Sequence, residues 1–423
     1  MKTCLILFAC LVFFACRKEY SAPVPDWTNW DAFEAPNALP LPSQTHNAIE
    51  GVYDVSAGAE TFGDKVAVKT SYVINNHDTT WHYSIFCGKD IGYFICEGRR
   101  VNSDILLNGY WRKMVSTETG IVRFTITAAN GGSILLSQNP NVTAGSVKVT
   151  GVFGNGENQP TDSISLVYNR KLNPSNSFQV IAHRAGGRTS DLLPASENSV
   201  AMIHKAAEYG ATGVEIDIRL TKDDSMILYH DATINLRETE KSGLVGPIEN
   251  YTYRELSNFI RLVRGEKIPT VRQALDAVIY ETPIRFVYLD TKITTKLDQL
   301  QQIQSEYRTK AAAAGRNVEI LIGIPAQDQL DNFLLLPGYT STPSLCELSI
   351  DDVRKANSRV WAPRWTLGTQ NEKVAEMHSE GRRVYVWTMD VPTYIDQYLD
   401  EGQLDGILTN YPSYVAYAHY IRQ

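Results

Sequence analysis

Two different rhythms of apolar and polar residues divide this chain into two parts. Between about residues 47 and 171, apolar and polar positions alternate over short stretches such as 81–86, and turn signals such as Asn130-Gly131-Gly132 separate them. A period of two is typical of half-buried antiparallel strands, and Asn and Gly favour the tight turns between them. The pattern therefore predicts an all-β domain over residues 46–173, built either as a small barrel or as a sandwich.

In the second part, short apolar segments alternate with longer segments of helical period. Helical candidates include residues 199–209, 271–280 and 296–314. A strand-then-helix repeat over about 245 residues predicts a parallel (β/α)8 barrel, or TIM barrel, over residues 176–423. The predicted fold class is therefore α/β with an all-β domain in front. Nine segments are strand candidates, one more than a ring of eight requires: residues 178–182, 213–218, 226–229, 285–289, 318–322, 345–348, 360–362, 384–387 and 405–408.

The first residues have the features of a targeting segment. Lys2 precedes an apolar run over residues 5–14, which is too short to span a bilayer and ends next to Cys16. A small residue before a Cys in this place resembles a bacterial lipoprotein signal. We therefore predict that residues 1–16 are a signal peptide, that Cys16 is lipidated, and that the protein is exported and anchored to the cell envelope as a periplasmic or outer-membrane lipoprotein. Cys10 offers a competing lipidation site, and an ordinary secretory signal is the alternative.

The segment that follows the signal is rich in proline. Residues 17–45 contain five prolines, a composition that excludes a long helix or a central strand. It predicts a tether between the anchor and the first domain. Export would permit a disulfide between Cys87 and Cys96, which flank a predicted hairpin turn, but two buried free thiols fit the sequence equally well.

Charge and composition narrow the classes of partner. Hydrophobic residues make up 43% of the 423 residues, enough for two cores, and the formal net charge is −7. Because the chain has no basic run, a nucleic-acid partner is not supported. We expect a small-molecule partner, with the membrane contacted only through the lipid anchor.

Ionisable residues gather where the predicted strands end. In a parallel barrel the carboxyl ends of all strands meet at one rim, where catalytic groups stand. Four consecutive strand candidates end there with such residues: His183 and Arg184, Glu215 and Asp217, His230 and Asp231, and Asp290 and Lys292.

The carboxylates among them predict a metal site. Glu215 and Asp217 are two residues apart on a strand, so their side chains share a face, and two acids aimed into one site repel unless a cation neutralises them. Asp290 offers a third carboxylate. Oxygen ligands favour one divalent cation, Ca²⁺ or Mg²⁺ with Mn²⁺ as a further choice, over zinc. A pair of salt-bridged acids is the structural alternative.

The remaining groups suit acid–base chemistry on a phosphate. His183 and His230 suit proton transfer near neutral pH, one as a base and the other as an acid. Arg184 and Lys292 can hold phosphoryl oxygens. The sequence therefore predicts phosphoryl chemistry at the barrel rim.

Several separated motifs, in this order, resemble the signature of glycerophosphodiester phosphodiesterases. The resemblance covers about residues 178–423. It is carried by His183-Arg184, Glu197-Asn198-Ser199, Glu215-Ile216-Asp217, His230-Asp231, Leu289-Asp290-Thr291-Lys292, Val386-Trp387-Thr388 and residues 405–410.

The resemblance implies a TIM barrel that uses a divalent cation to hydrolyse a glycerophosphodiester to glycerol 3-phosphate and an alcohol. Carried over to this chain, it implies three metal ligands, an acid–base pair and five substrate-binding residues. These are Glu215, Asp217 and Asp290 for the metal, His183 and His230 for acid–base catalysis, and Arg184, Lys292, Glu197, Asn198 and Trp387 for substrate binding and support of the site.

Departures from the family pattern leave the substrate open. Ala185 stands where the family usually has Gly, and Asp290 stands where the third acid is commonly Glu. Lysophospholipids and phosphoinositides are alternative substrates, and water or a neighbouring glycerol hydroxyl can be the nucleophile. A non-catalytic binding lipoprotein is the alternative from another class. The β domain is expected only to pack against and space the barrel.

Overall fold

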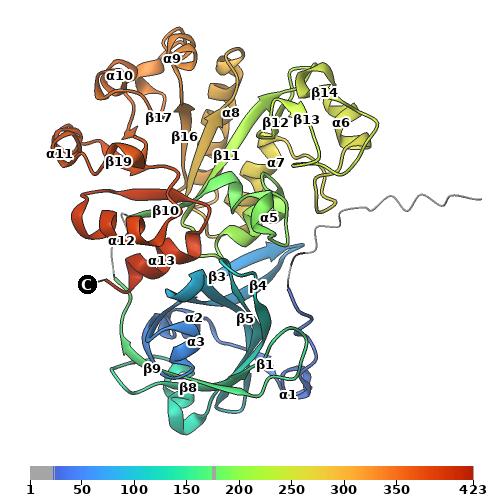
Figure 1. The fold of residues 1–423 in the computed structure, drawn as a ribbon, viewed down its shortest axis with the longest axis vertical. Helices are drawn as coiled ribbons and strands as arrows, with labels where there is room; N and C mark the ends of the chain where they lie inside the picture. Colours follow the sequence, from blue (N-terminus) through green and yellow to red (C-terminus); the bar gives the residue numbers. More distant parts are fainter. Residues whose placement is uncertain (1–21, 23, 174–177, 423) are drawn as a thin grey trace, which may run out of the picture.

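The computed structural model describes residues 22, 24–173 and 178–422. The predicted signal peptide, with Cys16, lies outside the described residues. In the part of the chain that is described, no helix has both the length and the apolar character that a membrane span requires. Two closed sheets, one after the other along the chain, organise the structure (Figure 1).

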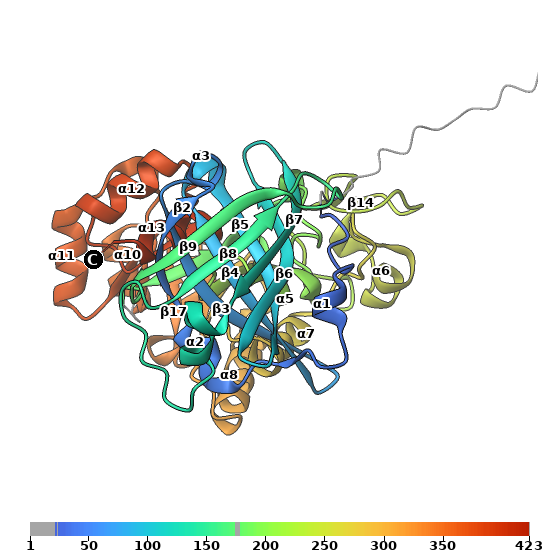
Figure 2. The same cartoon turned by 90° about the horizontal axis from the view of Figure 1, so that it is seen from below.

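The N-terminal sheet closes into an antiparallel barrel, which confirms the barrel form of the predicted all-β domain. It has nine strands; the short β1 lies on the edge of β5, and β2 to β9 pair in chain order and close where β2 meets β9 (Figure 2). The strands are β1 Leu39–Pro40, β2 Gly51–Ala57, β3 Lys65–Asn75, β4 Asp78–Cys87, β5 Gly92–Val101, β6 Asp104–Lys113, β7 Thr119–Ile126, β8 Lys148–Phe153 and β9 Asp162–Arg170.

Alternate residues of these strands point inward and fill the barrel. Phe94 and Trp111 are almost fully buried there, together with Phe62 from the short helix α3 (Ala59–Phe62). The ring centroids of Phe62 and Phe94 are 4.5 Å apart. The interior is therefore a packed hydrophobic core, as the alternating pattern predicts.

Cys87 and Cys96 belong to this core as free, buried thiols. Cys96 lies opposite Tyr83 in the β4–β5 ladder, so the two cysteines are out of register across the hairpin. Burial raises the pKa of both thiols. Of the two alternatives for this pair, the structure has the unpaired one.

Part of the predicted proline-rich tether lies against the barrel. It contains α1 (Asp31–Glu34) and leads through β1 into α2 (Ser43–Ala48). Phe33 is buried, and the Asn108 side chain donates a hydrogen bond of 3.0 Å to the Trp27 carbonyl. The proline pattern excludes a long helix or a central strand, but it does not predict these packing contacts.

The C-terminal sheet contains a closed parallel ring, which confirms the predicted TIM barrel. Of its nine strands, β12 is antiparallel, which leaves eight parallel strands; β10 pairs with both β11 and β20 and closes the ring. The ring strands are β10 Gln179–Ala182, β11 Gly213–Leu220, β15 Phe286–Thr291, β16 Glu319–Ile324, β17 Ser344–Cys346, β18 Val360–Trp361, β19 Arg383–Val386 and β20 Gly406–Thr409.

One predicted ring strand is wrong. Residues 226–229 contribute β12 (Met226–Leu228), which runs antiparallel to the end of β11 because a turn at residues 221–225 reverses the chain. His230 is therefore not the end of a ring strand. The reversal nevertheless returns it to the rim, where the Tyr229 N–H donates to the Asp217 carbonyl at 3.1 Å.

Helices surround the ring, and an insertion with β13 (Thr233–Ile234), β14 (Gly246–Pro247) and α6 (Tyr253–Phe259) follows β12 (Figure 1). The N-terminal barrel packs against α5 and α13, and its Phe86 and Tyr93 join a hydrophobic cluster of the TIM barrel. The two barrels thus share a core. The outer helices are α5 Val200–Ala206, α7 Val271–Asp276, α8 Leu297–Ala313, α9 Gln327–Phe333, α10 Ile350–Ala356, α11 Asn371–Ser379, α12 Pro392–Glu401 and α13 Pro412–Tyr420.

Candidate active site

Three carboxylates stand together at the carboxyl ends of β11 and β15. Glu215 and Asp217 share one face of β11, and Asp217 lies directly opposite Asp290 in the β11–β15 ladder. One oxygen from each of the three lies within 4.8 Å of the others. The strand period predicted this grouping, and the parallel register delivers the third acid.

These carboxylates have more negative charge than their neighbours neutralise. Within the described residues, Glu215 Oε1 and Asp290 Oδ1 are buried without a hydrogen-bond partner. In the described part of the chain, the ammonium group at the cluster is that of Lys292, whose Nζ lies 3.1 Å from Asp217 Oδ1 and pairs with Asp290. Buried, unpartnered carboxylate oxygens are strongly unfavourable unless a cation binds them. The donor set therefore fits one divalent cation.

The charge imbalance perturbs the acids in opposite directions. Burial, together with the charges of Asp217 and Asp290, raises the pKa of Glu215 well above its ordinary value. Burial also raises the pKa of Asp290. Burial alone would raise the pKa of Asp217, but the charge of Lys292, assisted by the hydrogen bond from Asn198, lowers it overall. In the absence of a cation, the cluster thus tends to keep a proton on Glu215.

His183 is held by a chain of hydrogen bonds from β20 and the loop after β19. Asp390 accepts both the backbone N–H of Asn410, at 2.8 Å, and the side-chain Nδ2, at 2.6 Å. This leaves the Asn410 Oδ1 as the acceptor that faces His183 Nδ1 at 2.8 Å. The proton must therefore be on Nδ1, and the lone pair of Nε2 faces Glu215 Oε2 at 3.8 Å.

Burial, followed by the charge of Arg184, lowers the pKa of His183 to about 4. Arg184 itself has a left-handed backbone, with φ of 52°, which points its N–H at Glu215 Oε2 at 2.7 Å. Its guanidinium donates to Glu197 at 2.9 Å and lies 2.9 Å from His230 Nε2. This arginine therefore joins the carboxylates to the second histidine.

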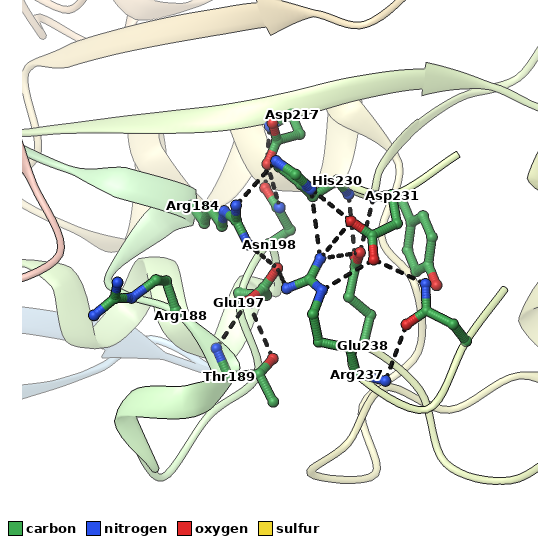
Figure 3. A network of polar contacts seen from close by, with 12 residues as sticks. Arg184, Arg188, Thr189, Glu197, Asn198, Asp217, His230, Asp231, Arg237 and Glu238 are labelled. Atoms are coloured by element: carbon green, nitrogen blue, oxygen red, sulfur yellow. Dashed lines mark hydrogen bonds and ion pairs between the residues drawn. The ribbon is translucent and has the colours of Figure 1, made fainter. Parts of the chain in front are cut away.

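The tautomer of His230 follows from its two neighbours. Because a guanidinium only donates, His230 Nε2 accepts from Arg184, and Nδ1 donates to Asp231 Oδ1 at 2.7 Å. Figure 3 shows this ring between Arg184 and Asp231. His230 is thus neutral in this arrangement, with a carboxylate behind it that can stabilise a positive charge.

Arg237 organises a second acidic group around His230. Its guanidinium donates to Glu197 Oε1 at 2.8 Å, to Asp231 Oδ1 at 2.7 Å and to Glu238 (Figure 3). Hydrogen bonds from Arg237 and His230 outweigh burial and lower the pKa of Asp231, whereas burial raises that of Glu238 to about 8. These acids already have an arginine partner, so they position His230 rather than offer a second metal site.

Asn198 orients the Asp217 carboxylate. Its Nδ2 donates to Asp217 Oδ2 at 2.7 Å, and its Oδ1 accepts the Asp217 backbone N–H at 3.0 Å. Glu197, the preceding residue, is 2% exposed and accepts from Arg184, Arg237 and Thr189. Glu197 and Asn198, the predicted supporting residues, therefore fix the positions of other site residues by hydrogen bonds.

Trp387 stands on the same rim, at the end of β19. Its Nε1 donates to the Ala362 carbonyl at 2.7 Å, and the guanidinium carbon of Arg364 lies 4.9 Å from its ring centroid. Apart from Cys16, which lies outside the described residues, the other predicted site residues gather at or next to the carboxylates, whereas Trp387 packs against Arg364.

Sequence reasoning missed Asp390, Asn410 and Glu347. Glu347 follows β17 and accepts a hydrogen bond of 2.6 Å from Tyr288; burial, followed by the charge of Asp290, raises the pKa of Glu347 to about 8. Glu347 and Asn410 directly follow β17 and β20, so the rule that polar residues at strand ends form the site could have identified them, whereas Asp390 stands four residues after the end of β19.

The comparisons with known proteins concern the TIM barrel. The model of the glycerophosphoryl diester phosphodiesterase family matches residues 183–336. Glycerophosphodiester phosphodiesterase 1 of Rattus norvegicus is 37% identical over 109 residues, which are 25% of this chain and 31% of that protein. A probable glycerophosphodiester phosphodiesterase 2 of Mycobacterium tuberculosis is 26% identical over 250 residues, 54% of this chain and 86% of that protein. The chain thus spans about a third of the length of the first of these relatives.

Solved structures with a similar fold have lower identity. A glycerophosphodiester phosphodiesterase from Parabacteroides distasonis is 23% identical, with a TM-score of 0.45, and the match covers 56% of this chain and 95% of that one. A phosphodiesterase from Oleispira antarctica, solved with the product sn-glycerol-3-phosphate, is 18% identical, with a TM-score of 0.45 and coverage of 56% and 94%.

Proposed function

Residues 183–336 form a domain of the glycerophosphoryl diester phosphodiesterase family, and from this premise we propose that the protein is a metal-dependent hydrolase that cleaves glycerophosphodiesters to glycerol 3-phosphate and an alcohol. The observation that carries the proposal is the buried cluster of Glu215, Asp217 and Asp290, two of whose oxygens have no partner among the described residues. Two histidines and two cationic side chains surround that cluster. This set of groups suits a negatively charged phosphodiester.

The three carboxylates would hold one divalent cation, Ca²⁺, Mg²⁺ or Mn²⁺. When bound, such an ion neutralises negative charge on a phosphoryl group and so favours attack on phosphorus. Lys292 would contact the phosphoryl oxygens, since its ammonium already lies at the carboxylate cluster, and Arg184 would contact them by turning its guanidinium away from His230. Trp387 and Arg364 would form the wall that faces the alcohol.

His183 would act as the base. Its Nδ1 proton is held by Asn410, so its Nε2 lone pair can accept a proton from the attacking hydroxyl. The same transfer serves either water or the neighbouring glycerol hydroxyl as the nucleophile.

His230 would act as the acid. When Arg184 turns to a phosphoryl oxygen, His230 Nε2 becomes free to take up a proton from solvent, and the resulting imidazolium gives this proton to the departing alkoxide. Asp231, at 2.7 Å from Nδ1, would stabilise the imidazolium in between. The proposed base and the proposed acid would thus act in different electrostatic environments.

Export and lipid anchoring through Cys16 are proposed from the sequence alone, because that residue lies outside the described part of the chain. Cys16→Ser should release the protein from the membrane fraction of a bacterial host that processes lipoproteins. A wild-type protein that stays soluble without any N-terminal lipid, by mass spectrometry, would contradict the anchor.

The activity is tested by release of glycerol 3-phosphate from glycerophosphocholine and glycerophosphoethanolamine, with lysophosphatidylcholine and glycerophosphoinositol as rival substrates. His183→Gln should lower kcat/KM by roughly 10²–10⁴-fold. His204→Gln is the matched control, because His204 lies on α5 and pairs with Glu281 at 2.6 Å. Absence of turnover on every diester with Ca²⁺, Mg²⁺ and Mn²⁺ would reject the hydrolase and favour a binding protein.

A further inference from the structure

The loop between β10 and α5, residues 184–198, contacts the N-terminal barrel. We call it the first catalytic loop. Arg112 near the end of β6 is 0% exposed and reaches across the boundary between the two barrels. Its Nη1 donates to the Leu192 carbonyl at 2.9 Å and its Nη2 to the Asp191 carbonyl at 2.6 Å. One buried side chain of the first domain thus binds two consecutive carbonyls of the loop that carries Arg184, Glu197 and Asn198.

A buried guanidinium is unusual at the packed boundary between two domains. Among the described residues Arg112 forms no ion pair with a carboxylate, so its buried charge is met by the two carbonyls. Burial of a cation is unfavourable, and an apolar side chain of similar volume usually stabilises a packed boundary as well or better. The arginine is therefore better explained by the loop conformation that it fixes than by stability.

Asp191 and Leu192, whose carbonyls Arg112 binds, are connected to the site on one side through Arg188. The Asp191 carboxylate accepts the backbone N–H of Arg188 at 2.8 Å and its Nη2 at 2.9 Å. Arg188 in turn lies 3.8 Å from Asp390, the residue that orients Asn410 behind His183.

On the other side the connection runs through Thr189 and Glu197. The backbone N–H and hydroxyl of Thr189 donate to Glu197 Oε2 at 2.8 and 3.1 Å, while Glu197 Oε1 accepts from Arg184 and Arg237 (Figure 3). Leu192 has a left-handed backbone, with φ of 53°, a conformation that persists only when its surroundings hold it.

We propose that Arg112 is a positioning residue that holds the first catalytic loop in its working conformation, so that the two barrels form a single catalytic unit. The proposal rests on the proposed function for its kinetic consequence. It replaces the expectation that the β domain only packs and spaces the TIM barrel. The proposed metal ligands stand on β11 and β15, and Arg184 and Asn198 of the loop donate hydrogen bonds to Glu215 and Asp217. Because Asp290 and the strands themselves lie outside the loop, the loss of Arg112 should affect catalysis more than cation affinity.

The test compares the full-length protein with Arg112→Met and with Arg170→Met. Arg170 is a matched control, because it is also an arginine of the N-terminal barrel that donates to a carbonyl of the other domain, but to Ile421 at 2.6 Å, after α13. In Arg112→Met, amide hydrogens in residues 184–198 should exchange roughly tenfold faster or more. kcat/KM should fall by roughly 10- to 100-fold, a larger factor than any change in the Kd for Ca²⁺ or Mg²⁺.

Arg170→Met should leave loop exchange and kcat/KM unchanged, and Arg112→Lys, which keeps a charged donor, should recover part of the loss. If Arg112→Met does not fold, Arg112→Lys carries the same comparison. A folded variant with wild-type loop exchange would overturn the proposal. If the wild type hydrolyses no diester, the proposed function fails, and the exchange comparison, which needs no substrate, still decides the role of Arg112.

Discussion

Asp390→Asn should remove the Nε2 lone pair of His183 from the side of the carboxylates, although His183 itself is unchanged. In the wild type the Asp390 carboxylate accepts two N–H groups of Asn410 and so turns the amide oxygen of Asn410 toward His183 Nδ1. An amide at position 390 presents a donor to the Asn410 amide, which favours a flip of Asn410. His183 Nδ1 would then face a donor, its proton would move to Nε2, and the lone pair would be lost from the side of the carboxylates.

The size of the effect follows from the bonds that change. A hydrogen bond to a charged group contributes about 1.5–3 kcal/mol, and every 1.36 kcal/mol corresponds to a factor of ten in rate. We therefore expect kcat/KM for glycerol 3-phosphate release to fall by roughly 10- to 150-fold. Nitrogen-15 NMR of the imidazoles would read the tautomer of His183 directly.

A carboxylate that lies away from the rim provides the control. Asp396 on α12 accepts a hydrogen bond of 2.7 Å from Tyr414, so Asp396→Asn changes the same chemical group without a contact to His183. The reasoning about His183 would be refuted if Asp390→Asn kept kcat/KM within about twofold of the wild type, or if its Nδ1 proton stayed in place while activity fell.

Three further outcomes follow from the charges and burial. Because burial beside other acids raises the pKa of Glu215, the folded chain keeps a proton that the unfolded chain releases. With EDTA present, the free energy of unfolding should therefore fall as pH rises above about 4.5, and Glu215→Gln should flatten this fall. Equal free energies of unfolding at pH 5 and 8, from denaturant titrations, would count against it. Arg237→Met removes the arginine partner of Asp231 and should lower the free energy of unfolding by about 1–3 kcal/mol, a range that allows for the 38% exposure of the arginine. A loss under about 0.5 kcal/mol would contradict the stabilising role of the ion pairs that Arg237 forms. Cys87 and Cys96 should react with a thiol reagent only after unfolding, and dithiothreitol should leave Tm unchanged; a Tm that falls with reductant would reveal a disulfide.

Much of the fold could be read from periodicity. The change from a period of two to a strand–helix repeat located both barrels, because each reflects which faces the backbone buries. The strand pattern could not distinguish residues 226–229 from a ring strand, since an apolar run does not specify direction; the turn at residues 221–225 decides it. The packing of Phe33 and Trp27 on the N-terminal barrel depends on tertiary contacts that no local pattern contains.

Some residues of the site could likewise be predicted from the sequence, and others could not. Glu215, Asp217 and Asp290 could be placed together because their spacing on parallel strands dictates a shared face. The roles of Asp390 and Asn410 depend on which amide atom faces which partner, and the sequence does not encode that orientation in any local spacing. The contact of Arg112 with the first catalytic loop was beyond prediction, because it depends on how two separately folded sheets pack.

The most direct test of the account is removal and return of the metal in one sample. Glycerol 3-phosphate release from glycerophosphocholine is measured before EDTA, after EDTA, and after addition of Ca²⁺, Mg²⁺ or Mn²⁺, with calorimetric titration of the same ions. Turnover that stops with EDTA, returns with one of the ions, and is absent together with ion binding in Glu215→Gln is the predicted result. Full turnover in EDTA-treated protein, or ion binding unchanged in Glu215→Gln, would contradict the assignment of the cation to Glu215, Asp217 and Asp290.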